Sequence, residues 1–149
     1  MQMEKIILLA EDSEDDALFF SRVLKRAGVQ NQIISFRDGR DAVAYLDGLG
    51  TYADRKKFPL PDIIFLDLKM APLDGWDVLA WIRATPQLRD IPVIVLTHNA
   101  EILKSESIRM LGAKSSLVKP FTEADLLNLI ARFPDPWILP PVGTDGPRL

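Results

Sequence analysis

Five side chains suited to metal or phosphoryl chemistry fall at the carboxyl ends of predicted strands. The acids Glu11 and Asp12 follow one apolar run, Asp67 ends a second, and Thr97 and Lys119 end two more. In an open α/β sheet the carboxyl ends of parallel strands share one edge, where ligands usually bind. We therefore expect these five side chains to meet in one site.

The five residue types suggest a particular chemistry. Three carboxylates held close together repel one another unless a cation joins them. Mg²⁺ is the expected cation, because it prefers oxygen ligands and usually binds through one or two carboxylates and several waters. Lys119 would add a fixed positive charge and Thr97 a hydroxyl donor. Since an Asp carboxylate can act as a phosphate-accepting nucleophile, the set predicts a phosphoryl group carried on Asp67.

Strands and helices alternate five times along the chain. Apolar runs predict strands at 6–10, 32–36, 63–67, 91–96 and 116–118, and apolar residues at helical spacing follow each of them. This alternation predicts an α/β fold with a parallel sheet between two helical layers. The best match is a flavodoxin-like (βα)5 three-layer sandwich with strand order 2-1-3-4-5.

Capping residues mark the expected helix starts. Ser13 with Asp16, and Thr122 with Asp125, have capping-box spacing. The acids Glu14, Asp15 and Asp16 suit the positive end of a helix and are interpreted as helix acids rather than metal ligands. The second helix is expected to bury Ala42, Val43, Leu46 and Leu49, and the third to bury Val78, Leu79 and Ile82. The fourth helix is expected to span Ile102 to Leu111.

Composition narrows the class of protein. The 149 residues are 48% hydrophobic and 26% charged, with a net charge of −3, which argues against a nucleic-acid-binding surface. Zero Cys excludes disulfides and thiolate metal sites. No segment approaches the roughly 20 apolar residues of a membrane span, and the first apolar run is too short for a signal peptide. A cytoplasmic protein without membrane contact is expected.

Two segments stand apart from the alternating pattern. The stretch 48–61 carries Gly, Pro and the basic cluster Arg55-Lys56-Lys57, which fits either a solvated loop or a docking loop. The range 133–149 holds five prolines and an apolar run around Trp137, and its prolines exclude regular helix. We expect residues 1–132 to form one domain and the tail 133–149 to dock on it or to lie at a dimer interface.

These residues together resemble the receiver domain of two-component response regulators, the CheY-like family, over about residues 5–132. The likeness rests on the acidic pair, on Thr97, on Lys119-Pro120, and on the turn that runs from Asp67-Leu68-Lys69-Met70 to Asp74-Gly75. It implies that Asp67 is phosphorylated by the phosphohistidine of a sensor histidine kinase. It also implies that Glu11, Asp12, Asp67 and the main-chain carbonyl of Lys69 hold Mg²⁺, and that the Lys119-Pro120 peptide is cis.

The same resemblance implies a signalling domain rather than an enzyme, limited to its own phosphotransfer and dephosphorylation. The sequence shows no output domain, so we expect a stand-alone regulator that signals by conformational change or protein contact. The insertion 49–61 and the tail are similar to those of small regulators paired with phytochromes. That likeness implies a phytochrome as kinase, and a homodimer formed through the fourth helix, fifth strand and fifth helix.

Three positions depart from the family pattern. The proline of Ala71-Pro72 lies one place later than usual, and His98 stands where a small residue is common. Ser116 occupies the position of the aromatic residue that turns inward on activation. With Ser116 there, we expect a muted rearrangement near the fifth strand, carried by the following helix or the tail.

Two other functions share parts of this pattern. An aspartyl-phosphate phosphatase of the haloacid dehalogenase type uses a strand-end Asp, a Lys and Mg²⁺, but it needs Asp-x-Asp, and Lys69 stands in place of the second Asp. A flavin-nucleotide binder needs a phosphate loop rich in Ser, Thr and Gly after the first strand. The acidic run 11–16 would repel a phosphate there.

Overall fold

A parallel sheet forms the centre of the computed structural model, which describes residues 5–70, 73–104 and 106–132. The five strands of this part of the chain lie in the order β2-β1-β3-β4-β5, as predicted. Every neighbouring pair is parallel. The strands are β1 Ile6–Ala10, β2 Gln32–Phe36, β3 Ile63–Asp67, β4 Val93–Thr97 and β5 Ser115–Val118.

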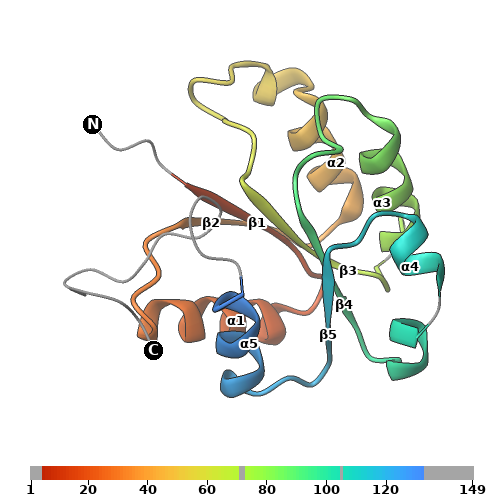
Figure 1. Ribbon diagram of the computed structural model, residues 1–149. Coiled ribbons are helices and arrows are strands. Elements are labelled where there is room, and N and C mark those ends of the chain that lie inside the picture. Colours follow the sequence, from red (N-terminus) through yellow and green to blue (C-terminus); the bar gives the residue numbers. More distant parts are fainter. Residues whose placement is uncertain (1–4, 71–72, 105, 133–149) are drawn as a thin grey trace.

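Helices cover both faces of the sheet, which confirms the predicted three-layer sandwich. Helices α1 and α5 lie on one face, and α2, α3 and α4 lie on the other (Figure 1). Short 3₁₀ turns, η1 and η2, precede β3 and α4. The bounds are α1 Glu14–Arg26, α2 Gly39–Asp47, η1 Gly50–Ala53, α3 Gly75–Ala84, η2 Ala100–Lys104, α4 Glu106–Met110 and α5 Glu123–Ile130.

Alternating side chains of the strands divide the core into two halves. In β1, Ile7 and Leu9 pack toward α1 and α5, whereas Leu8 and Ala10 pack toward α2 and α3. This follows from the two-residue period of a strand. All residues of β1, β3 and β4 are buried, while β2 is partly exposed at the sheet edge. The central strands therefore hold their carboxyl ends in fixed positions.

Side-chain caps fix where the helices start. Ser13 Oγ accepts the main-chain N–H of Asp16 at 3.2 Å at the start of α1. Asp74 Oδ1 accepts the N–H of Asp77 at 3.0 Å at the start of α3. At α5, Thr122 and Asp125 form the predicted capping box. Each cap satisfies N–H groups that the first helical turn leaves without a partner.

Two expected elements differ from the structure. Leu49 is not part of the buried face of α2, because the helix ends at Asp47 and Leu49 is 55% exposed. The helix expected from Ile102 to Leu111 is divided into η2 and the short α4. The turn η2 starts at Ala100, before the expected helix, because Asn99 holds its first residues. The side chain of Asn99 accepts the N–H of Glu101, and its carbonyl accepts the N–H of Ile102, an i to i+3 bond typical of a 3₁₀ turn.

The insertion before β3 is anchored by Arg55. The guanidinium donates to the carbonyls of Tyr45 (2.8 Å) and Leu46 (2.7 Å) in the last turn of α2, and to the carbonyl of Phe58 (3.2 Å). Cationic side chains suit this end of a helix, where carbonyls lack partners. Of the two interpretations of this stretch, a solvated loop does not describe the half-buried Arg55, although Lys56 is exposed, and the docking loop stays a prediction.

Aromatic rings fasten the same insertion to the domain. Tyr45 of α2 is fully buried, and its hydroxyl donates to the carbonyl of Pro59 at 2.6 Å. Its ring contacts those of Phe36, Tyr52 and Phe58. Stacked and edge-on aromatic contacts of this kind stabilise beyond the area that they bury. The insertion is thus a packed unit that leads into the amino end of β3 and also contacts Phe36, at the carboxyl end of β2.

Some predictions fall on residues that the structure does not describe. The docking of the tail 133–149 and the geometry of Ala71-Pro72 lie outside the described residues. Trp76 and Trp81 of α3 are half-buried and pack against the core. Among the described residues, the helices are too short or too polar to cross a membrane.

Candidate functional site

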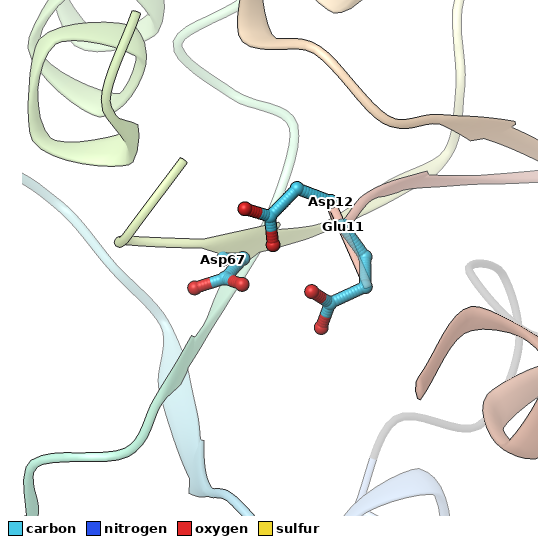
Figure 2. A group of neighbouring side chains, drawn as sticks. All are labelled: Glu11, Asp12 and Asp67. Carbon is cyan, nitrogen blue, oxygen red and sulfur yellow. The ribbon is translucent and has the colours of Figure 1, made fainter. Parts of the chain in front are cut away.

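Three carboxylates meet at the carboxyl edge of the sheet. Glu11 and Asp12 directly follow β1, and Asp67 ends the neighbouring strand β3 (Figure 2). The strands are in register, with Ala10 opposite Leu66. One oxygen from each carboxylate lies within 4.8 Å of the others. Glu11 and Asp67 are buried, whereas Asp12 is exposed at the mouth of the site.

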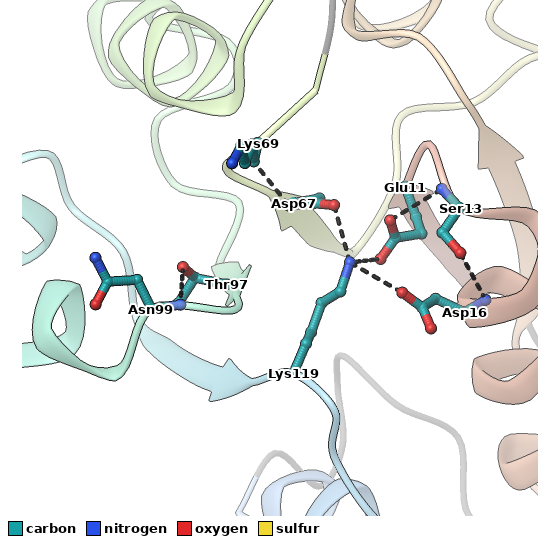
Figure 3. Close-up of polar contacts among 8 residues, drawn as sticks. All are labelled: Glu11, Ser13, Asp16, Asp67, Lys69, Thr97, Asn99 and Lys119. Carbon is teal, nitrogen blue, oxygen red and sulfur yellow. Dashed lines mark hydrogen bonds and ion pairs between the residues drawn. The ribbon is translucent and has the colours of Figure 1, made fainter.

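Lys119 enters this group from the loop after β5. Its ammonium donates to Glu11 Oε1 at 2.7 Å and to Asp67 Oδ2 at 3.0 Å, and it forms an ion pair with Asp16 Oδ2 at 3.1 Å (Figure 3). The Lys119 side chain is only 3% exposed. A buried cation of this kind needs paired anions, and here they come from three different segments.

The turn after Asp67 is held tightly in place. Asp67 Oδ1 accepts the main-chain N–H of Lys69 at 2.9 Å, and the N–H of Gly75 donates to the carbonyl of Leu68 at 2.9 Å. A Cβ on Gly75 would lie 2.2 Å from the carbonyl oxygen of Asp67. Only glycine allows the start of α3 to approach the strand end so closely.

Thr97 ends β4, the strand beside β3, and is buried. Its Oγ1 accepts the main-chain N–H of Asn99 at 3.1 Å. In Figure 3 the contact drawn from Thr97 runs to Asn99 within the same loop. The hydroxyl oxygen thus accepts from its own loop, and a hydroxyl that accepts one hydrogen bond can still donate its own hydrogen to another group.

Burial and neighbouring charges shift the pKa values of Glu11 and Lys119. Burial raises the pKa of Glu11 to about 8 from its usual 4.5, a hydrogen bond with Asp67 adds to the rise, and the contact with Lys119 opposes it. Burial alone would lower the pKa of Lys119, but its hydrogen bonds to Glu11 and Asp67 outweigh this and the pKa is raised. Lys119 is therefore charged at neutral pH.

The raised pKa of Glu11 links stability to pH. The folded protein holds this proton more tightly than the unfolded chain does. The stability that the protonated Glu11 contributes to the folded state is fully present below about pH 4.5 and is lost as the pH rises through about 8.

The donor set fits a hard divalent cation. It offers only carboxylate oxygens, which Mg²⁺ and similar ions prefer, and the exposed Asp12 leaves the group open to solvent and its waters. The three carboxylates share one lysine that already pairs with two of them. A cation at this position would offset the remaining negative charge.

The structure brings together most of the predicted site. Glu11, Asp67 and Lys119 are in contact, and Asp12 lies with the carboxylates. The Lys119-Pro120 peptide is cis, as the resemblance implied. The main-chain N–H of Lys69 contacts Asp67, while the role of its carbonyl as a metal ligand stays a prediction.

Two further residues, His98 and Asp16, lie near the site. His98 is exposed at the rim. Asp16 is a residue of the site that sequence reasoning missed: it has the expected helix position in α1 and also pairs with Lys119. Only the three-dimensional placement of the loop after β5 beside α1 reveals this second contact, because the two residues are far apart in sequence.

Comparisons with a family model and with known proteins indicate the same family. The family model of the response regulator receiver domain matches residues 7–131. Response regulator Rcp1 of Synechocystis sp. is 35% identical over 137 residues, which cover 90% of this chain and 89% of Rcp1.

Solved structures of similar proteins agree with the fold. The bacteriophytochrome response regulator RtBRR has a TM-score of 0.80 at 33% identity, over 99% of this chain and 82% of that one. The Mn²⁺-bound form of Rcp1 has a TM-score of 0.73 at 34% identity, over 97% and 99% of the two chains. The phosphorylated cyanobacterial phytochrome response regulator RcpA has a TM-score of 0.74 at 31% identity, over 86% and 89%.

Proposed function

The chain belongs to the response regulator receiver domain family, and we propose that it accepts a phosphoryl group on Asp67 from the phosphohistidine of a sensor kinase in the cytoplasm. Receiver domains are signalling domains rather than enzymes in the usual sense. The observation that carries the proposal is the Asp67 carboxylate held between the N–H of Lys69 and the ammonium of Lys119, beside two further acids.

The chemistry follows from how Asp67 is held. A carboxylate oxygen attacks the phosphorus, and the phosphorus–nitrogen bond of the donor breaks. The main-chain N–H of Lys69 orients the carboxylate, and Lys119 offsets negative charge on the phosphoryl oxygens as the group transfers. The hydroxyl of Thr97, whose oxygen accepts the N–H of Asn99, would donate its hydrogen to the phosphoryl group and draw the loop after β4 toward Asp67.

Glu11, Asp12, Asp67 and the carbonyl of Lys69 are the residues proposed to hold Mg²⁺. The ion would supply charge neutralisation between the carboxylates and the phosphoryl oxygens. Support comes from the three converging carboxylates and from the Mn²⁺-bound form of the relative Rcp1.

Affinity for Mg²⁺ is expected to rise with pH, because the ion must displace the proton of Glu11, whose pKa is raised to about 8. Between pH 6 and 7 the apparent affinity should increase by up to about tenfold, with close to one proton released per ion. Titration calorimetry in two buffers of different ionisation enthalpy measures both quantities. Glu11→Gln should bind more weakly and lose this pH dependence, and an affinity that stays flat from pH 6 to 8 would contradict the protonated state of Glu11.

The direct test of the proposed function uses the purified chain with Mg²⁺ and a small phosphodonor such as acetyl phosphate. Intact-mass spectrometry should show one added phosphoryl group that depends on Mg²⁺ and is lost at alkaline pH, as expected for an acyl phosphate. No mass increment under any Mg²⁺ concentration would refute the proposal.

The chain is closely related to bacteriophytochrome response regulators, and we propose a phytochrome as its kinase and a homodimer as its working form. Met110, at the end of α4, is 75% exposed on the face that the resemblance assigns to pairing. Light scattering at tens of micromolar should give the mass of two chains. Met110→Glu should weaken the dimer about tenfold or more, because it places a charge in an apolar contact.

Leu49→Glu is the matched control for this change. Leu49 is also an exposed apolar residue, at 55%, but it lies in the insertion rather than on the α4 face. A chain ending at Arg132 tests separately whether the tail takes part. A monomeric full-length protein would rule out the dimer, whereas an intact dimer after truncation would rule out only the tail.

A further inference from the structure

The third partner of Lys119 lies outside the group of acids at the strand ends. Asp16 belongs to the first turn of α1, and its Oδ2 lies 3.1 Å from the Lys119 ammonium. Glu11 and Asp67 occupy the other two positions, at 2.7 and 3.0 Å. A lysine ammonium has three N–H groups, so these three carboxylates match its whole capacity to donate.

The three partners differ in their freedom to move. The side chains of Glu11 and Asp67 are 1% and 3% exposed and are fixed at strand ends. The Asp16 side chain is 42% exposed on a helix surface, so its carboxylate can turn into water at little cost. When Lys119 must accept a new anion, Asp16 is therefore the partner that can leave.

A phosphoryl group on Asp67 brings such an anion, with up to about two negative charges. Its oxygens need the ammonium of Lys119, and a carboxylate at the same ammonium repels them. We propose that Asp16 is a positioning residue that competes with the phosphoryl group for Lys119 and so weakens the hold of the site on that group. This inference rests on the proposed function of Asp67.

Asp16→Asn tests the competition, since it removes the charge and keeps the shape. The N-cap survives this change, because Ser13 accepts the main-chain N–H of Asp16 and not its side chain. The variant should bind the phosphoryl mimic beryllofluoride, in the presence of Mg²⁺, about three- to tenfold more tightly than the unaltered chain. Titration calorimetry gives this affinity. The rate of phosphorylation by acetyl phosphate should rise in the same direction.

Asp15→Asn is the matched control, because Asp15 carries the same charge in the same helical turn and is exposed. It should leave the affinity for beryllofluoride unchanged, and Asp16→Glu, which restores the charge, should return it close to the unaltered value. An affinity of Asp16→Asn equal to that of Asp15→Asn, or weaker than that of the unaltered chain, would overturn the competition. If the unaltered chain binds no beryllofluoride, the proposed function fails and this inference fails with it.

Discussion

Replacing Asp67 with Asn is expected to abolish phosphorylation by a kinase or by acetyl phosphate, while the fold remains. The amide has nearly the same shape and its oxygen can still accept the N–H of Lys69, but it is not a nucleophile toward phosphorus. Removal of a nucleophile typically costs several orders of magnitude, so the rate should fall by at least about a thousandfold. Intact-mass spectrometry over time measures the loss, and circular dichroism checks the fold.

Asp90→Asn is a suitable control for this experiment. Asp90 is an exposed acid shortly before β4, at the edge of the sheet opposite the site. The Asp90→Asn variant should be phosphorylated on Asp67 at the same rate as the unaltered chain. Incorporation that persists undiminished in Asp67→Asn would place the phosphoacceptor at another residue.

Gly75→Ala is expected to destabilise the domain by about 2–3 kcal/mol and to impair phosphorylation as well. The added Cβ would lie 2.2 Å from the carbonyl oxygen of Asp67 and 2.5 Å from the Cα of Leu68. Both atoms belong to the backbone, so no side chain can yield, and either α3 or the turn after β3 must move. The higher helix propensity of Ala offsets only about 1 kcal/mol of this cost. Urea unfolding gives the change in stability.

Gly50→Ala separates this clash from the general cost of replacing a glycine. A Cβ at Gly50 meets no atom within 4 Å, although its φ of +53° carries a strain of about 1 kcal/mol for other residues. Its phosphorylation rate should be normal. If Gly75→Ala proved as stable and as active as Gly50→Ala, the close approach of α3 to the Asp67 turn would not matter for the site.

The positions of the strands and most of the site residues could be predicted from local sequence signals, and the strand order from the alternation of strands and helices with right-handed crossovers. Buried strands read as continuous apolar runs, and Glu11, Asp67 and Thr97 stand directly where those runs end. Parallel order then brings the ends together. The caps at Ser13 and Thr122 were also predictable, since their partners lie three residues away.

Contacts between distant segments were not predictable in this way. Asp16 reads as an ordinary helix acid until the loop after β5 places Lys119 beside it. Arg55 reads as part of a solvated basic cluster until its guanidinium meets the end of α2. Leu49 fits the apolar spacing of α2, but Gly48, at φ 71°, ends the helix before it. For Asp16 and Arg55 the deciding interaction depends on the path of the backbone and not on residue spacing, whereas Gly48 is a local signal that ends a helix.

The anchoring of the insertion has a consequence for how this protein can change over evolution. The hydrogen bonds that tie the loop to α2 join residues no more than 14 positions apart, from Tyr45 to Pro59. The loop is therefore anchored by local contacts, and its Tyr52 also packs on Phe36, whose carbonyl accepts the N–H of Glu11. Selection can alter the length and surface of this segment, and with them any recognition that it provides, as long as the contacts that hold it to α2 are kept.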